Sequence, residues 1–132
     1  MLKKNKKIIL DASALLAFID EEKGCEIIEE FLPDVVISSV NISEVLCVSA
    51  RRGVDISVLL PKIRSIVSDI RSFDEEQAYI AAELYESTKK YGLSLGDRAC
   101  LALSLSIGSA VITADKAWKN IKFKNDIIFL RG

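Results

Sequence analysis

The chain contains no histidine, and this removes several kinds of catalytic chemistry at once. Without an imidazole there is no Ser-His or Cys-His nucleophile pair, no His-ligated zinc, and no histidine acid–base pair of the kind used by metal-free ribonucleases. The cysteines Cys25, Cys47 and Cys100 are far apart in the sequence, which also disfavours a zinc site made of cysteines alone. Any hydrolytic chemistry must come from carboxylates, lysine, hydroxyls or a metal ion bound by oxygen.

Most of the 19 acidic residues have ordinary positions. The acids between Asp20 and Glu30 have the spacing of a solvated loop and helix face. Glu86 precedes Lys90 by four residues, as in an exposed helical ion pair. Another group stands at chain breaks and helix starts, where a turn or capping role is sufficient, namely Asp34, Asp55, Asp74 and Asp126.

Three further acids occur where a site is more often built. Asp11 directly follows the apolar run Ile8–Leu10, and Asp115 follows the run Ala110–Thr113 in the same manner. If both runs are parallel strands, these acids lie at carboxyl ends of strands, where open α/β sheets form their sites. Asp97 begins a helix that is apolar nearly all round. For each of the three, a helix-capping role remains an equally simple interpretation.

Glu44 is the least ordinary of the acids. Its neighbours on the helix face are Val40, Cys47 and Val48, so its side chain leaves from an apolar face. No Lys or Arg stands three or four residues away to pair with it. Because a buried unpaired carboxylate costs several kcal/mol, this position predicts a compensating partner, such as a divalent cation shared with other carboxylates.

Together the four acids predict a metal site made only of oxygen ligands. Hard ligands without nitrogen or thiolate favour Mg²⁺ or Mn²⁺. Such an ion can lower the pKa of a bound water and stabilise the charge that develops in phosphoryl transfer. The residues therefore indicate metal-dependent hydrolytic chemistry through Asp11, Glu44, Asp97 and Asp115, suited to phosphodiester bonds.

The elements that must position these acids alternate between strand and helix. Short apolar runs predict strands at Ile8–Leu10, Val35–Ile37, Ile70–Phe73, Ala110–Thr113 and Ile127–Leu130. Helical periodicity and capping residues predict helices at 14–19, Glu21–Phe31, Asn41–Arg51, Ile56–Val67, 74–91 and Ala99–Ile107, and a short one around Trp118. This alternation predicts an α/β fold with a central parallel β-sheet flanked by α-helices. A length of 132 residues suits one domain spanning 1–132.

Charge and hydropathy restrict the partners and the compartment. Acidic and basic residues nearly balance, 19 against 18, so no global basic field attracts nucleic acid. A nucleic-acid partner must instead meet a local basic patch or a bound cation. No apolar run approaches the roughly 20 residues that a membrane-spanning helix needs. The three separated cysteines are interpreted as buried and reduced, which predicts a cytoplasmic protein without a membrane partner.

Four segments carry a resemblance to a known family. They are Leu10-Asp11-Ala12-Ser13-Ala14-Leu15, Asn41-Ile42-Ser43-Glu44-Val45, Leu93-Ser94-Leu95-Gly96-Asp97-Arg98-Ala99-Cys100-Leu101-Ala102 and Ile112-Thr113-Ala114-Asp115-Lys116-Ala117-Trp118. In this order and spacing, over nearly the whole chain, they resemble the PIN-domain family, and in particular the VapC-type toxins of toxin–antitoxin pairs. Each segment is weak alone, and the set of four is specific.

The resemblance implies a function as well as a fold. It implies endonucleolytic cleavage of structured RNA, often tRNA or ribosomal RNA, with Mg²⁺ or Mn²⁺ bound by Asp11, Glu44, Asp97 and Asp115. It also implies inhibition by a cognate antitoxin protein and assembly into a homodimer. Ser13 and Thr113 match hydroxyl positions that support the first and last acids, although a plain capping role is as good an interpretation for both.

Three side chains close in sequence to the acids have the chemistry to contact RNA. Arg98 and Lys116 adjoin two of the acids, and we expect them as possible contacts to RNA phosphates. Trp118 has the chemistry to stack on a base. Its helical spacing after Asp115 favours packing in the core instead.

Other functions stay open at this stage. A housekeeping PIN nuclease and a non-catalytic PIN scaffold that binds RNA or protein share the same motifs. A receiver-type signalling module also gathers acids around Mg²⁺, but it needs a paired acid after the first strand and a phosphorylatable Asp after a central one. Here Asp11 is followed by Ala12 and Ser13, and Ile37 is followed by Ser38 and Ser39, so this alternative is disfavoured.

Overall fold

The computed structural model describes residues 7–131 and contains one all-parallel sheet with the strand order β3-β2-β1-β4-β5. The strands are β1 (Ile8–Leu10), β2 (Val35–Ser38), β3 (Asp69–Arg71), β4 (Ala110–Thr113) and β5 (Ile127–Phe129). In the register, Ile9 of β1 lies between Val36 of β2 and Val111 of β4. The chain order reverses at β1, which makes the carboxyl ends of β1 and β4 the place where a site is expected.

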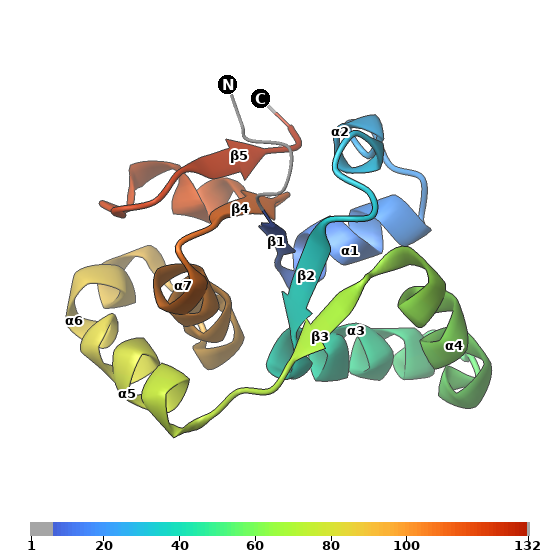
Figure 1. Ribbon diagram of the computed structural model, residues 1–132, viewed down its shortest axis with the longest axis horizontal. Coiled ribbons are helices and arrows are strands. Elements are labelled where there is room, and N and C mark those ends of the chain that lie inside the picture. The colour runs from blue at the N-terminus through green and yellow to red at the C-terminus, as the bar shows by residue number, and fades with distance from the viewer. Residues whose placement is uncertain (1–6, 132) are drawn as a thin grey trace.

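Helices cover both faces of this sheet (Figure 1). On one face lie α1 (Ala12–Ile19), α2 (Glu26–Glu29), α3 (Ser39–Arg51) and α4 (Ile56–Ile66). On the other lie α5 (Glu75–Glu83), α6 (Tyr85–Thr88), η1 (Lys89–Tyr91), α7 (Leu95–Ile107) and η2 (Lys116–Asn120), of which η1 and η2 are 3₁₀ helices. The predicted α/β architecture with a central parallel sheet is therefore confirmed.

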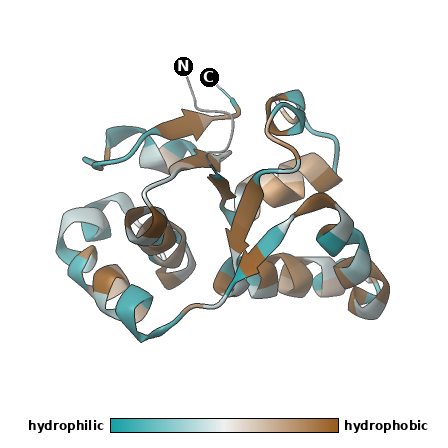
Figure 2. Ribbon diagram, viewed as in Figure 1, coloured by the Kyte–Doolittle hydropathy of each residue, from teal (hydrophilic) through white to brown (hydrophobic). Residues whose placement is uncertain are grey.

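Alternating strand residues divide the core into two halves. Ile8 and Leu10 of β1 pack with α1, α3 and α4, whereas Ile9 packs with α7 and η2. Helix α7 is buried between the sheet and α5, which explains why its sequence is apolar nearly all round. Figure 2 shows the central strands and α7 in brown, beside the paler α5 and α6. Trp118 is buried in the same half, as predicted.

One predicted helix is much shorter in the structure. The helix expected over Glu21–Phe31 is reduced to α2, Glu26–Glu29. Two residues before it have positive φ, Glu21 at 53° and Gly24 at 94°. A Cβ at Gly24 would also collide with the backbone carbonyl of Leu130, so the chain needs glycine there for both reasons.

Two other boundaries also differ from the prediction. The helix expected over 74–91 is divided into α5, α6 and η1, and it ends at Gly92 with φ of 74°. Asp74 accepts a hydrogen bond from the Gln77 N–H, but the Gln77 side chain donates to the Ser72 carbonyl rather than completing a capping box. The strand expected at Ile70–Phe73 is shifted to Asp69–Arg71.

The predicted burial of the cysteines was wrong for one of the three. Cys100 is buried, Cys25 is half-buried, and Cys47 is exposed on α3, so the expectation that all three are core residues was wrong for Cys47. Across residues 7–131, no helix has the length and apolar character needed to cross a bilayer.

Candidate active site

The four predicted acids come from the same edge of the sheet. Asp11 follows β1, Asp115 follows β4, and Asp97 lies in the first turn of α7. Their charges act on one another, because Asp97 raises the pKa of Asp11 and Asp115 raises the pKa of Asp97. Glu44 comes from the second turn of α3, whose start follows β2 directly. The Thr113 hydroxyl bonds to the Asp11 carboxylate and to the Asp115 backbone, so the fold brings together two acids that are 104 positions apart.

Asp11 is the most firmly held of the four acids. It is only 2% exposed and caps α1 by accepting a hydrogen bond of 2.8 Å from the Ala14 N–H. Its oxygens also accept bonds from the Ser13 hydroxyl at 2.8 Å and the Thr113 hydroxyl at 2.5 Å. Burial raises the pKa of Asp11 to about 6, with a smaller contribution from the charge of Asp97, and the three donors oppose that rise.

The two hydroxyls also connect β4 to α1. The Thr113 oxygen accepts a hydrogen bond from the Asp115 N–H at 3.0 Å, and the Ser13 oxygen accepts one from the Ala114 N–H at 3.0 Å. Because a hydroxyl donates once and accepts at its lone pairs, each can serve Asp11 and the loop together. Both predicted supporting hydroxyls therefore donate to the carboxylate of Asp11. Thr113 contacts Asp115 through the backbone N–H of Asp115 and not through its carboxylate.

Asp97 and Asp115 each combine capping with a place in the cluster. Asp97 forms a capping box with Ser94: one carboxylate oxygen accepts from the Ser94 N–H at 2.9 Å. Burial and the charge of Asp115 raise the pKa of Asp97, against the hydrogen bonds from Ser94 and the charge of Arg98. Asp115 caps η2 by accepting from the Ala117 N–H at 2.9 Å. The capping role and the site role are thus compatible, since each carboxylate has a second oxygen.

Glu44 differs from its prediction, because it is half-buried and it has a partner. The side-chain amide of Asn41 donates to Glu44 Oε1 at 2.7 Å. Glu44 also lines an open hollow along α3 with Ser43, Cys47 and Arg51. The sequence reasoning missed Asn41 because it considered only cationic partners. The signal was present, since Asn41 stands three residues before Glu44 and therefore on the same helix face.

The pKa of the buried Cys100 thiol responds to the charges of three of the acids. The thiol is fully buried, and burial raises its pKa well above the usual range. The negative charges of Asp11, Asp97 and Glu44 raise it further. The charge of Glu44 thus acts on the same buried thiol as the charges of Asp11 and Asp97, and the Glu44 carboxylate lies against Gly96, the residue before Asp97.

The donor set suits a hard divalent ion. Carboxylates are ligands that Mg²⁺ and Mn²⁺ prefer, and the charge of Asp97 raises the pKa of Asp11 while the charge of Asp115 raises the pKa of Asp97, as expected for like charges near one another. Within residues 7–131, no three acidic or cysteine side chains stand close enough to form a finished ligand set. Mg²⁺ is commonly held by one or two carboxylates with water at its other positions, so a looser cluster fits this ion.

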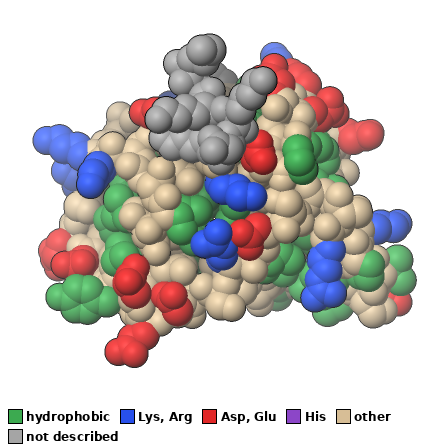
Figure 3. Space-filling model, in the orientation of Figure 1, with side chains coloured by type: hydrophobic (Ala, Val, Ile, Leu, Met, Phe, Trp, Pro, Cys, Tyr) green, Lys and Arg blue, Asp and Glu red, His purple; other side chains and the backbone are tan. Residues whose placement is uncertain are grey.

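The two cations predicted near the site have different surroundings. The Arg98 guanidinium donates to the Ala81 carbonyl of α5 at 2.9 Å and lies 5.4 Å from the ring centroid of Tyr85. Lys116 is exposed at the start of η2. RNA contact stays a prediction for both, and the Arg98 side chain is already engaged with neighbouring elements. The face in Figure 3 shows scattered blue side chains and two groups of red ones, near α2 and near α5, rather than an extended basic area.

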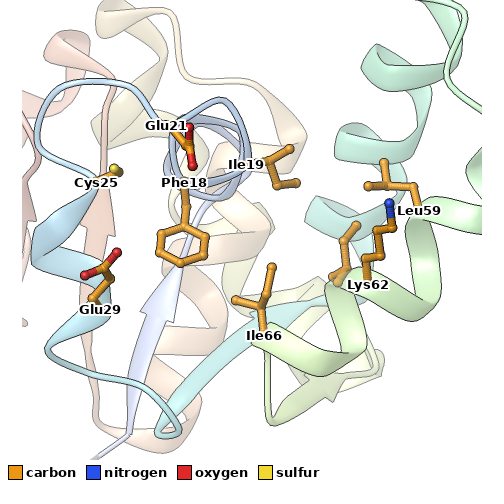
Figure 4. A pocket seen from close by; sticks show the side chains of 9 residues that line it. Phe18, Ile19, Glu21, Cys25, Glu29, Leu59, Lys62 and Ile66 are labelled. Atoms are coloured by element: carbon orange, nitrogen blue, oxygen red, sulfur yellow. The ribbon is translucent and has the colours of Figure 1, made fainter.

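A second hollow lies between α1, α2 and α4 (Figure 4). Its volume is about 280 Å³, and its apolar wall includes Phe18, Leu59 and Ile66. Charged side chains also line it: Glu29 from α2 and Lys62 from α4. We call this hollow the α1/α2/α4 groove.

Comparison with known proteins agrees with this architecture. A family model described as the PIN domain matches residues 8–124. No curated protein is similar enough to match the chain.

Several solved structures share the fold. A toxin–antitoxin complex from Klebsiella pneumoniae has a TM-score of 0.69 and 19% identity, covering 87% of this chain and 92% of that chain. DNA-bound VapBC from Salmonella typhimurium has a TM-score of 0.72 and 16% identity, covering 95% and 98%. VapC20 from Mycobacterium tuberculosis, described as a sarcin–ricin loop cleaving toxin, has a TM-score of 0.67 and 14% identity, covering 83% and 91%.

Proposed function

The chain belongs to the PIN-domain family, and on that premise we propose that it is a Mg²⁺- or Mn²⁺-dependent endoribonuclease, the toxin of a toxin–antitoxin pair. The observation that supports the proposal is the position of four acids at the strand ends and helix starts of one edge of the sheet, where the charges of three of them act on the buried Cys100. In a chain without histidine, an oxygen-bound metal is a route to hydrolysis that these carboxylates can supply.

In this proposal Asp11, Glu44, Asp97 and Asp115 hold the ion. When bound, the ion activates a water molecule and stabilises negative charge on the phosphate. Asp11 is held by three hydrogen bonds, so its carboxylate keeps one orientation during the reaction. A pKa of about 6 leaves Asp11 mainly deprotonated at neutral pH, which is the state that binds a cation.

The proposed substrate is structured RNA, either tRNA or ribosomal RNA. Support comes from the similarity to a mycobacterial toxin described as cleaving the sarcin–ricin loop. The exposed Lys116, beside Asp115, is available to meet an RNA phosphate at the rim of the site. A homodimer, a cytoplasmic location and a single domain over 1–132 belong to the same proposal.

The proposed inhibitor is a cognate antitoxin protein. The similar structures from Klebsiella and Salmonella are toxin–antitoxin complexes, which supports a protein partner of this class. We assign the α1/α2/α4 groove to an amphipathic antitoxin segment, since apolar grooves accept such segments through their side-chain anchors. An antitoxin arginine would suit the acidic site, because guanidinium pairs with carboxylates in place of a metal cation.

The proposal is tested by incubating the purified protein with total RNA in Mn²⁺ and in EDTA. Cleavage in Mn²⁺ only, lost in Asp11→Asn and kept in the surface control Glu86→Gln, is the expected result. Cleavage in EDTA contradicts metal dependence. No cleavage of any RNA in Mn²⁺ contradicts the nuclease and favours a non-catalytic PIN scaffold.

The toxin role is tested separately in cells. Expression of the wild type should arrest growth, and co-expression of the small protein encoded in the adjacent reading frame should relieve it. RNA cleavage without growth arrest favours a housekeeping PIN nuclease.

A further inference from the structure

Asn41 is a buried amide at the junction of two acid-bearing helices. It lies in the first turn of α3, one turn before Glu44, and is only 1% exposed. Its Nδ2 donates to Glu44 Oε1 at 2.7 Å and to the Gly96 carbonyl at 3.0 Å. Both partners can only accept, so the nitrogen of the amide must be the atom that faces them.

Gly96 supplies the other half of this arrangement. It is buried in the first turn of α7, and a Cβ placed on it would collide with both carboxylate oxygens of Glu44. Gly96 therefore leaves free the space that the Glu44 carboxylate occupies, and any side chain at this position would displace that carboxylate. The carboxylate of Glu44 is seated between the Asn41 amide and the Cα of Gly96. We call this arrangement the Glu44 seat.

We propose that Asn41 is a positioning residue of the candidate site, which orients the Glu44 carboxylate and fixes it to the first turn of α7 beside Asp97. This inference rests on the proposed function, since it concerns how the metal-binding acids are held. Through Gly96, the Asn41 amide connects the helix that carries Glu44 to the residue preceding Asp97. Two acids from different helices are thereby kept in a constant relation.

The neutral amide is well suited to this task. A lysine or arginine in its place would orient Glu44 equally well but would neutralise the charge needed for a cation. An amide gives a hydrogen bond without changing the net charge of the cluster. It also restricts a side chain with three rotatable bonds, so less conformational entropy remains to be lost when an ion binds.

The first experiment measures the dissociation constant for Mn²⁺ by calorimetry in the wild type and in Asn41→Leu. Leucine keeps the approximate shape and removes both hydrogen bonds. Because partners that orient metal ligands typically contribute about 10- to 100-fold to affinity, we expect at least a roughly tenfold weakening. Unchanged affinity contradicts the positioning role.

Asn125→Leu is the matched control. The Asn125 amide also donates twice to α7, at 3.0 Å to the Ser104 carbonyl and at 3.0 Å to its hydroxyl, but near the other end of that helix. Both substitutions remove two hydrogen bonds, so both are expected to lower the melting temperature. Only Asn41→Leu is expected to weaken Mn²⁺ binding, and equal weakening in both would indicate a general structural effect.

A double-mutant cycle tests whether Asn41 acts through Glu44. In a Glu44→Gln background, Asn41→Leu should weaken Mn²⁺ binding by less than about twofold, because the carboxylate that it orients is already absent. A full and additive weakening would overturn the assignment.

The Glu44 seat can be tested even if Asn41→Leu does not fold. Gly96→Ala should be less favourable for the melting temperature in the wild type than in a Glu44→Ala background, since the new methyl group must displace the Glu44 carboxylate. In a Glu44→Ala background the same substitution should be neutral or stabilising, because alanine favours helix over glycine. Equal effects in both backgrounds contradict the seat.

The outcomes separate this inference from the proposed function. A wild-type protein that binds no Mn²⁺ contradicts the proposed function and the positioning of a metal ligand together. A wild type that binds Mn²⁺ no better than Asn41→Leu contradicts the role of Asn41 alone.

Discussion

The hydroxyl of Thr113 donates a hydrogen bond to Asp11 across 102 residues of sequence, from the last residue of β4 to the residue that follows β1. The same oxygen accepts from the Asp115 N–H. One side chain thus fixes the orientation of one candidate ligand and the backbone of another. The strand pairing of β1 with β4 makes this contact possible.

Replacing Thr113 should affect both the fold and metal binding. Thr113→Val keeps the side-chain shape and removes the hydrogen bond to Asp11. We expect the free energy of unfolding to fall by about 1.5–3 kcal/mol, the usual contribution of a hydrogen bond to a charged group, and Mn²⁺ affinity to weaken. Urea denaturation and calorimetry measure the two effects.

Thr88→Val is the control for this substitution. The Thr88 hydroxyl is also buried and donates to the Leu84 carbonyl at 2.7 Å, away from the acids. The Thr88→Val protein should be less stable than the wild type and should bind Mn²⁺ with the same affinity. A Thr113→Val protein with normal Mn²⁺ affinity would show that the hydroxyl has only a structural role.

The metal-free protein should become less stable as the pH rises from about 4 to about 6. The pKa of Asp11 is raised by burial from 3.8 to about 6 in the folded state, so the native state binds more protons than the unfolded state in this interval. The stabilisation is complete below the unfolded pKa and is lost as the pH passes the folded value. Its size is on the order of 3 kcal/mol.

Urea denaturation in EDTA measures the free energy of unfolding at pH 4 and at pH 6, and the change between the two is compared between variants. Asp11→Asn should remove most of the decline between pH 4 and 6, whereas the exposed control Asp126→Asn should retain it. Identical pH profiles for the wild type and Asp11→Asn would contradict the burial argument.

Arg98 and Lys116 should respond differently to truncation. Arg98→Ala removes the bond to the Ala81 carbonyl and the contact with the Tyr85 ring, so we expect a loss of about 1–2 kcal/mol in unfolding free energy. Lys116→Ala should leave stability within about 0.5 kcal/mol, because it is an exposed side chain, and should raise the KM for RNA. A higher KM in Arg98→Ala at unchanged stability would instead favour direct RNA contact by Arg98.

The α1/α2/α4 groove should bind the antitoxin independently of catalysis. Leu59→Asp places a charge in the apolar wall and should weaken antitoxin binding at least roughly tenfold, equivalent to about 1.4 kcal/mol. The neighbouring exposed Val58 is not part of that wall, so Val58→Asp is the control. RNA cleavage by the free protein should be similar in both variants. Equal antitoxin affinity in Leu59→Asp and Val58→Asp would show that the antitoxin binds outside the α1/α2/α4 groove.

The positions of Asp11 and Asp115 could be predicted because short apolar runs in the sequence identify the strands and their ends. Each follows a short apolar run, and parallel strands place their carboxyl ends at one edge. The helix α7 was predicted over Ala99–Ile107 and begins at Leu95, directly after its cap Ser94, so the prediction missed its first turn.

Contacts between distant elements could not be predicted in the same way. The truncation of α2 depends on Gly24 lying against Leu130, which is distant in the sequence. The environment of Glu44 depends on Gly96 of another helix, and on the Asn41 amide that a search for opposite charges overlooks. Periodicity identifies the face that a residue occupies, whereas its partner depends on which helices come together.

A Mn²⁺ titration followed by calorimetry shows whether the four acids bind a hard cation as one shared site. The wild type should bind Mn²⁺, and Asp11→Asn, Glu44→Gln, Asp97→Asn and Asp115→Asn should each weaken the affinity at least roughly tenfold, about 1.4 kcal/mol. The exposed control Glu86→Gln should bind as the wild type does. Wild-type affinity in any two of the four variants would contradict a shared site.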